Sequence, residues 1–367
     1  MIICVCSRLF FSVRLGHKAH HEPKWARKAQ IKPIPLSKTF QMTITHPHEN
    51  EQSKALEAMM AMYHDVSGDF KFQYESKGVK VSSFTPPGAS MPVMRGDLCM
   101  PHSPADIVAL INCVGARSQC KIKMLITRAG DDRFEGYAFR DSFFDQTTLL
   151  YTMQKGSWPV SGRDMCNISK RIYDAASGST TIIQSSVVDP KVPEVNGRVR
   201  AQLHGALTVI RPSLEKPGWS DCTYMVNVDV MGTVPNSIIK IVSASTPLCL
   251  ANISAYLSAQ GVPPSVNLVR VEQPGRMLKL HRYDFDHAKK SASIALDCEQ
   301  GSVSDTMEFR IDSKMYPHGL KVKNEGVAAK FEKREGGMVS IIPMAEGLVF
   351  YTITMLTSGP EGQLLIE

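Results

Sequence analysis

The sequence predicts an α+β fold in which a curved antiparallel sheet surrounds a long helix, followed by a second domain built from strands alone. Between residues 49 and 264, short strand-like stretches punctuated by Gly and Pro alternate with segments of helical spacing. Beyond residue 264 only strand-like stretches follow, with turn signals at intervals of roughly ten residues, which is typical of a β-sandwich. We therefore expect an α+β domain over residues 49–264 and a β-sandwich over 265–367.

The positive charge of the chain is concentrated in its first 48 residues. This segment holds eight of the 42 Lys and Arg residues and one of the 35 acidic residues, so the rest of the chain carries 34 of each. A nucleic-acid-binding protein normally spreads a basic face over its folded domain, because neutralisation of phosphates supplies most of the affinity. We therefore expect no nucleic-acid partner. The basic segment 1–48 is interpreted either as a mitochondrial transit peptide or as a disordered tail.

The spacing of the Cys residues and the hydropathy of the chain argue against a zinc protein, a disulfide-stabilised protein and a membrane-spanning protein. The nine Cys residues contain no C-x-x-C pair, so neither a zinc signature nor a disulfide framework is indicated. No window approaches the roughly 20 consecutive apolar residues that a membrane-spanning helix needs. We expect a soluble folded part in the reducing cytoplasm, peripheral to membranes, with neither metal nor cofactor.

The first domain should open with a helix over residues 51–64 whose buried stripe is apolar. The stripe consists of Leu56, Met59, Met60 and Tyr63. Three strands follow, at residues 70–76, 79–84 and 93–100. Ser103 is a favourable N-cap and Pro104 suits the first helical position, so a second helix is expected from there. Ile107, Leu110 and Ile111 should form its buried face.

A second run of strands leads to a long helix. The strands are expected at residues 147–154, 163–174, 179–188, 197–210 and 222–230, and the helix at 235–260. Pro247 lies in the middle of this helix, where it removes a backbone hydrogen bond, so a kink or a local opening is expected there.

Motifs of catalysis are missing from the sequence. There is no G-x-S-x-G, G-x-x-x-x-G-K-[ST], H-E-x-x-H or G-x-G-x-x-G segment. Asp131, Asp132 and Glu135 could form an acid and base pair. They lie in AGDDRFEG, which is interpreted as a solvated turn.

Three ordered segments carry a resemblance to a known family. The first is the W-P-x-S-x-R-D pattern of residues 158–164, the second is SSVVDPKVPEVNGRVRAQ at 185–202, and the third is VDVMGTVPNSII at 228–239. Together they resemble the START (StAR-related lipid-transfer) domain over about residues 50–262. The resemblance implies a helix-grip fold in which the sheet grips the C-terminal helix around a cavity holding one lipid. The protein would then bind and transfer a phospholipid, sphingolipid or sterol and dock at membrane surfaces, without being an enzyme.

The resemblance and strand alternation together indicate which residues line the cavity. Met165, Asn167 and Ser169 share one face of their strand, and Gln184 lies where ceramide-transfer relatives place an amide. The full predicted lining is Met165, Asn167, Ser169, Gln184, Tyr224, Val226, Ile238, Val242, Cys249 and Tyr256. The Arg163-Asp164 pair and Arg200 are expected to be structural, tying strand ends and loops together.

Entry of a lipid requires an opening. Displacement of the C-terminal helix with the loop 174–180 is expected to provide it, with Gly178 and Pro247 as gate residues. Burial of acyl chain is worth about 0.8 kcal/mol per methylene, so a long chain is held by roughly ten kcal/mol without covalent chemistry.

Two alternatives remain. The same fold could act as an enzyme or polyketide cyclase with His204 as acid or base, or as an adaptor whose cavity is vestigial. The β-sandwich resembles GOLD-type or C2-like domains in its number of strands, and we expect it to target a membrane or a protein. Asp284 and Asp286 do not form the acidic cluster that calcium requires.

Overall fold

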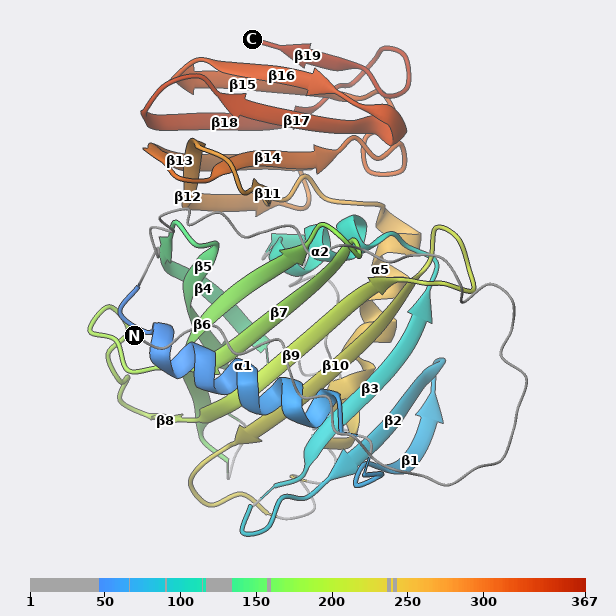
Figure 1. Ribbon diagram of the computed structural model, residues 1–367, viewed down its shortest axis with the longest axis vertical. Coiled ribbons are helices and arrows are strands. Elements are labelled where there is room, and N and C mark those ends of the chain that lie inside the picture. The colour runs from blue at the N-terminus through green and yellow to red at the C-terminus, as the bar shows by residue number, and fades with distance from the viewer. Residues whose placement is uncertain are drawn as a thin grey trace, which may run out of the picture. The chain divides into compact units, whose positions relative to one another are not determined.

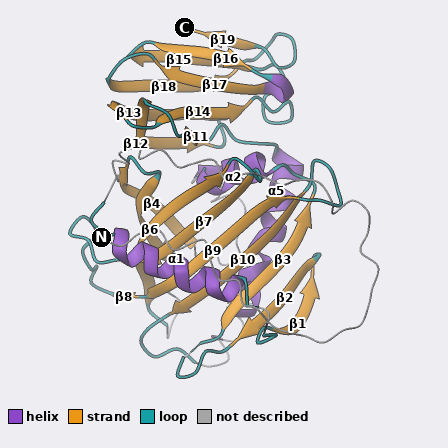
Figure 2. Ribbon diagram, in the orientation of Figure 1, coloured by secondary structure: helices purple, strands orange, loops and turns teal. Residues whose placement is uncertain are grey.

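The computed structural model describes residues 46–116, 134–156, 160–235, 239 and 243–367, except for the single positions 66, 90 and 114 (Figure 1). These residues belong to one compact unit, Met42–Glu367. The expected fold class is confirmed, because a large sheet with helices comes first along the chain and two smaller sheets follow (Figure 2).

The large sheet has ten strands. Hydrogen bonds join nine of them in the order β1-β2-β3-β10-β9-β7-β6-β5-β4, and the short β8 pairs with β6. Neighbours along this path are antiparallel, whereas β8 runs parallel to β6. The strands are β1 (Lys71–Ser76), β2 (Val79–Phe84), β3 (Val93–Met100), β4 (Phe134–Phe143), β5 (Thr147–Gln154), β6 (Gly162–Asp174), β7 (Ser179–Ser186), β8 (Arg198–Arg200), β9 (Gln202–Pro212) and β10 (Ser220–Asp229). Because β3 pairs with β10, strands from the two ends of the first domain meet inside the sheet.

Helix α1 (Glu49–Tyr63) covers the outer face of the large sheet, against β7 and β9 (Figure 1). Its Met59 is 1% exposed and packs with Ile183 and Leu207. The helix approaches β9 so closely that a Cβ atom on Gly205 would lie 2.5 Å from Met59 Cγ. The apolar stripe therefore predicted this face in part: Met59 is buried and Leu56, Met60 and Tyr63 are partly buried. The buried Gln52 and Ala55 were not in the stripe.

Helices α2 (Pro104–Asn112) and α5 (Cys249–Gln260) pack against the inner face. The predicted cap of α2 is confirmed, since Ser103 Oγ accepts a hydrogen bond from the backbone N–H of Asp106 at 3.2 Å. Ile107 and Leu110 are 0% exposed and join a core that includes Leu257 of α5. The two faces of the sheet thus carry separate apolar clusters.

The helix expected at residues 235–260 is interrupted at Pro247, as predicted. A 3₁₀ turn over Thr246–Leu248 leads into α5. Pro247 packs tightly on β3, because a Cβ atom on Gly96 would lie 2.7 Å from Pro247 Cβ. The hydroxyl of Tyr74 in β1 donates a hydrogen bond to the carbonyl of Ala244. The segment around Pro247 is therefore held by the first strands of the sheet.

The C-terminal region consists of two small sheets, as expected for a sandwich. One sheet has the order β11-β14-β17-β16 and the other the order β12-β13-β18-β15-β19. The strands are β11 (Asn267–Val271), β12 (Gly275–Asp286), β13 (Ser291–Gly301), β14 (Ser304–Arg310), β15 (Leu320–Gly326), β16 (Ala329–Lys333), β17 (Met338–Pro343), β18 (Gly347–Met355) and β19 (Leu364–Ile366). The boundary placed at residue 264 stays a prediction.

Strands β4 and β11 were not predicted. The register of β4 shifts at Phe134/Gly136 and again at Phe139/Asp141, so its alternation of apolar and polar residues is broken. The stretch interpreted as a turn therefore ends inside a strand, and Glu135 belongs to β4, whereas Asp131 and Asp132 lie outside the described residues. Strand β11 has only five residues, too few for a clear pattern.

The sandwich shares one apolar core with the inner side of the large sheet. The hydroxyl oxygen of Tyr283 in β12 lies 2.8 Å from Cys113 Sγ and 3.2 Å from the carbonyl oxygen of Pro264, and its single hydrogen can be donated to either. Arg310 of β14 forms an ion pair with Asp106 of α2, at 2.7 Å between Nη1 and Oδ2. The C-terminal strands are therefore packed against α2.

The Arg163-Asp164 pair has the contacts of a structural element. Arg163 donates hydrogen bonds to the carbonyls of three residues, namely Ser161, Val230 and Met231. Asp164 is 1% exposed and accepts hydrogen bonds from Arg200 Nε at 2.8 Å and from the hydroxyl of Tyr151 at 2.9 Å. The pair thus ties the start of β6 to β5, to β8 and to the loop after β10.

Replacement of Asp164 by Ala should lower the free energy of unfolding by about 3 kcal/mol, because it leaves Arg200 and Tyr151 without their partner. Urea unfolding followed by circular dichroism measures this change. The control is Asp284→Ala, which removes the exposed ion pair with Arg282 and should change the free energy by less than about 1 kcal/mol. Equal effects of the two substitutions would contradict the structural role of Asp164.

Candidate functional site

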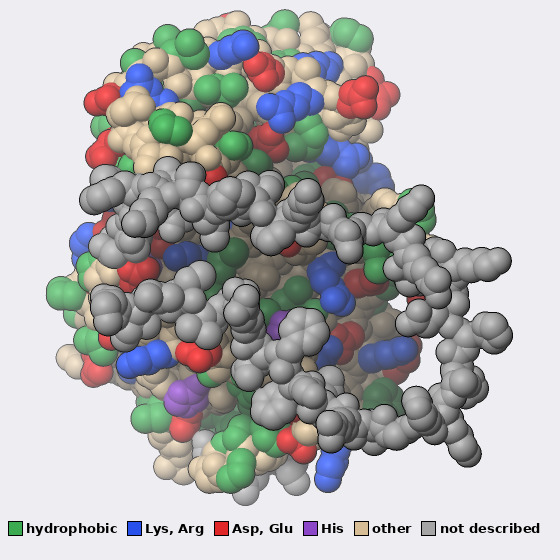
Figure 3. Space-filling model, in the orientation of Figure 1, with side chains coloured by type: hydrophobic (Ala, Val, Ile, Leu, Met, Phe, Trp, Pro, Cys, Tyr) green, Lys and Arg blue, Asp and Glu red, His purple; other side chains and the backbone are tan. Residues whose placement is uncertain are grey.

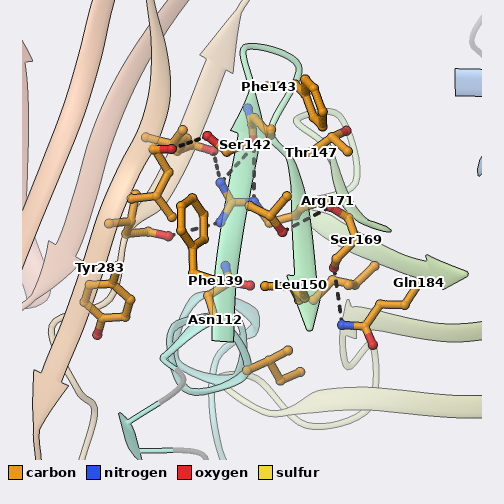
Figure 4. A pocket seen from close by; sticks show the side chains of 17 residues that line it. Asn112, Phe139, Ser142, Phe143, Thr147, Leu150, Ser169, Arg171, Gln184 and Tyr283 are labelled. Atoms are coloured by element: carbon orange, nitrogen blue, oxygen red, sulfur yellow. Dashed lines mark hydrogen bonds between the residues drawn. The ribbon is translucent and has the colours of Figure 1, made fainter. Parts of the chain in front are cut away.

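A cavity of about 100 Å³ lies between the inner face of the large sheet and the first strands of the sandwich (Figure 4). Helix α2, four strands of the large sheet and the region around β11 and β12 contribute to it. The lining residues are Ile111, Asn112, Phe139, Ser142, Phe143, Gln146, Thr147, Thr148, Leu150, Ser169, Arg171, Ile182, Gln184, Val266, Leu268, Leu280 and Tyr283.

Much of the lining is apolar and comes from both sides. Leu150 and Ile182 belong to the sheet, whereas Leu268 and Leu280 belong to the sandwich. A mostly apolar wall with a few polar groups is the usual composition of small-molecule sites. The site therefore suits an amphipathic ligand.

One row of polar side chains crosses the sheet at the cavity. Thr148, Ser169 and Gln184 stand opposite one another on β5, β6 and β7. The amide nitrogen of Gln184 donates a hydrogen bond to Ser169 Oγ at 3.3 Å, which Figure 4 marks. The amide oxygen of Gln184 and the hydroxyl hydrogen of Ser169 are groups with which a ligand can form hydrogen bonds.

Arg171 follows Ser169 on the same face of β6, since side chains two positions apart point the same way. It is half-buried and donates hydrogen bonds to Gln146 Oε1 and to the carbonyls of Val266 and Leu268. Burial lowers the pKa of Arg171 to about 10, which still leaves the guanidinium charged at neutral pH. Gln146 has a φ angle of 64°, a conformation that few residues other than Gly adopt.

Of the ten predicted lining residues, the structure brings Ser169 and Gln184 together in this cavity. Asn167 is 3% exposed, and its Oδ1 accepts a hydrogen bond from Ser186 Oγ at 2.9 Å. Met165 is partly buried against the apolar core of the inner face. The shared inward face of these residues agrees with the alternation used to predict it, although only Ser169 reaches the cavity.

The remaining predicted residues lie elsewhere. Val226 belongs to the inner core, and Tyr224 and Cys249 pack against it. The hydroxyl of Tyr256 forms a hydrogen bond with His287 Nδ1 at 3.0 Å. Ile238 and Val242 are outside the described residues. A lipid-contacting role for all of these residues stays a prediction.

The structure also shows where the residues predicted for catalysis and for gating lie. His204, proposed as acid or base, is exposed on β9 and does not line the cavity. Gly178 lies in the turn between β6 and β7 with a φ angle of 67°. No group of three His, Cys, Asp or Glu side chains among the described residues is arranged to hold a metal ion. The described helices include none with the length and hydropathy of a membrane span.

Of the 17 lining residues, 15 were not predicted as cavity residues, for three different reasons. Arg171 could have been found, because the alternation that selects Ser169 also selects it. Phe139 lies in β4, which was not predicted. The wall formed by Val266, Leu268 and Leu280 comes from a region treated as a separate domain, and no local pattern indicated that contact.

Comparison with known proteins finds one family to which part of the chain is similar. Residues 138–254 match the START domain. The "Steroidogenic acute regulatory protein, mitochondrial" of Salvelinus fontinalis is 34% identical over 110 residues, which cover 29% of this chain and 38% of that protein. The protein of the same name from Danio rerio is 30% identical over 94 residues, covering 25% and 32%. The chain thus spans well under half the length of these relatives.

Among solved structures, human StAR-related lipid transfer protein 5 aligns with a TM-score of 0.48 and 18% identity, covering 57% of this chain and 95% of that one. The sequence match at residues 138–254 contains all three of the motifs described above. In this segment the chain is similar to the START domain.

Proposed function

We propose that this protein binds one lipid in the cavity behind β5, β6 and β7 and transfers it between membranes without chemical change. The single observation that supports this best is the composition of the cavity, an apolar wall crossed by one polar row. Apolar burial supplies affinity for the chain of a lipid, and the polar groups select its head.

Catalysis is the second candidate, and the cavity lining argues against it. Among the described residues that line the cavity, none is His, Asp, Glu, Cys or Lys. Tyr283 is the remaining acid, and burial raises its pKa well above the usual value, which keeps the phenol protonated at neutral pH. A general acid or base poised near neutral pH is therefore missing from the lining.

We propose that the protein docks at membrane surfaces, because transfer of a lipid requires contact with a membrane. Among the coloured side chains visible in Figure 3, Lys and Arg are interspersed with Asp and Glu. This distribution favours a lipid ligand and a membrane surface over a nucleic acid as partners.

Native mass spectrometry of the purified protein tests the proposed function. We expect a retained lipid, released in unchanged form by denaturation, and we expect added protein to speed the movement of that lipid between donor and acceptor vesicles. A preparation that is always empty and cannot be loaded from vesicles contradicts the proposal. A retained compound that leaves the protein chemically altered favours the enzyme.

The cavity must widen to admit a lipid, because about 100 Å³ is well below the roughly 300–1,000 Å³ of sites for drug-sized ligands. We propose that the segment around Pro247 moves with α5, together with the turn that contains Gly178. The hydrogen bond from Tyr74 to Ala244 and the contact of Pro247 with Gly96 hold this segment in the closed position.

Hydrogen exchange tests the gate. The amides of residues 243–246 and 248 should exchange faster than those of β9, and faster still with vesicles present. Tyr74→Phe removes one hydrogen bond and should raise their exchange roughly fivefold. Tyr173→Phe, at an exposed tyrosine, is the control and should leave it unchanged. Protection equal to that of β9 under all conditions would place the gate elsewhere.

The cellular location is proposed from residues 1–48. Two of the relatives are named as mitochondrial, and the basic composition of this segment matches a transit peptide. A fluorescent protein fused behind residues 1–48 should therefore collect in mitochondria. The matched control replaces the eight Lys and Arg residues of the segment by Gln. Diffuse fluorescence of both fusions indicates instead that residues 1–48 are a tail without a targeting function and that the protein stays in the cytoplasm.

A further inference from the structure

Arg171 is a cation in the cavity whose hydrogen-bond acceptors are all neutral. Nε and Nη2 donate to Gln146 Oε1 at 3.2 and 2.8 Å, and Nη2 also donates to the carbonyl of Leu268 at 2.9 Å. Nη1 donates to the carbonyl of Val266 at 3.3 Å. A guanidinium has five N–H groups, so these four bonds leave one N–H of Nη1 available.

The carboxylates near Arg171 form ion pairs with other basic side chains. Asp305 is 0% exposed and forms an ion pair with Arg270, at 2.8 Å between Oδ1 and Nε. Asp145 forms an ion pair with Lys170 at 2.9 Å. No carboxylate of the described residues lies within the 4.0 Å of an ion pair with Arg171. A charge removed from water without a counter-charge is costly, and that cost is recovered if a ligand supplies the counter-charge.

The position of Arg171 suits the head group of an amphipathic ligand. It lies across from Ile182 on β7 and two residues from Ser169, whose hydroxyl bonds to Gln184. Arg171 lines the same cavity as this polar row, and Leu150 and Leu280 provide apolar walls there for the chain. Hydrogen bonds between a guanidinium and a carboxylate or phosphate are about twice as strong as those between neutral groups.

We propose that the ligand is a single-chain lipid with an anionic head group, a carboxylate or a phosphate, bound at Arg171. This inference rests on the proposed function and names the lipid class for the same cavity. One chain is favoured over two because the closed cavity measures about 100 Å³, and a single chain requires the smaller expansion. Arg171 is then the residue that determines specificity.

Lipids that share a chain and differ in the head group test the proposal. Oleic acid supplies a carboxylate, oleoyl lysophosphatidic acid a phosphate, and monooleoylglycerol a neutral head. We expect the purified protein to bind at least one of the two acids about tenfold or more tightly than monooleoylglycerol in competition with a fluorescent fatty-acid probe. The acid that binds more tightly identifies the head group.

Substitutions separate recognition from structure. Arg171→Met should abolish the preference for acids while keeping affinity for monooleoylglycerol within about threefold, and Arg171→Lys should keep part of the preference. Arg282→Met changes an exposed arginine and is the matched control. It should keep the full preference for acidic over neutral lipids. A purely structural Arg171 predicts instead that Arg171→Met weakens binding of acidic and neutral lipids equally.

The outcomes distinguish this inference from the proposed function. Equal affinity of the unmodified protein for oleic acid, lysophosphatidic acid and monooleoylglycerol overturns the inference and leaves lipid binding intact. A preference for cholesterol over both acids overturns it too. Failure to bind any of these lipids, while native mass spectrometry finds a two-chain lipid, overturns the inference alone. The proposed function is overturned only if the protein is also empty in native mass spectrometry and cannot be loaded from vesicles. The comparison on the unmodified protein decides the question even if Arg171→Met does not fold.

Discussion

The apolar core along the inner face of the large sheet is the interaction on which the rest of the structure depends. It joins residues that are far apart in the sequence, among them Val81 of β2, Leu110 of α2, Leu257 of α5 and Leu278 of β12, all at most 3% exposed. Burial of apolar surface contributes roughly 25 cal/mol per Å², so leaving this face open to water is expensive. The helices and the sandwich are therefore held to the sheet by the same free-energy term.

The cavity lies where polar side chains interrupt the apolar core. Ser169, Gln184 and Arg171 each have hydrogen-bonding groups that cannot be covered by hydrocarbon without a partner. Their presence at one end of an otherwise apolar interior keeps that end suited to a polar group. An amphipathic ligand satisfies both requirements, because its chain continues the core and its head meets the polar row.

Local patterns predicted much of the fold. The stripe of α1, the Ser103 cap and the interruption at Pro247 each depend on short-range physics, and each is found as expected. Strand β4 was not predicted, because two register shifts break its alternation of apolar and polar residues. The candidate site was predicted only in part, since strand alternation selected Ser169 and the family resemblance selected Gln184.

The rest of the site depends on contacts between distant segments. Tyr256 was expected to contact ligand because of its position in the family resemblance, yet its hydroxyl forms a hydrogen bond with His287 of the sandwich. Leu280 likewise reaches the cavity from a region with its own strand pattern. Local periodicity describes how each strand is buried, but it carries no information about which distant surface covers it.

The wall formed by Val266, Leu268 and Leu280 gives the sandwich a share in the contacts of any bound ligand. A ligand that touches both walls adds its binding free energy to the adhesion between the sandwich and the sheet. Thermodynamic reciprocity then applies, so a partner that draws the sandwich away from the sheet weakens the hold on the ligand by the same factor. Under the proposed function, a partner that binds the C-terminal strands in this way would promote release of the lipid.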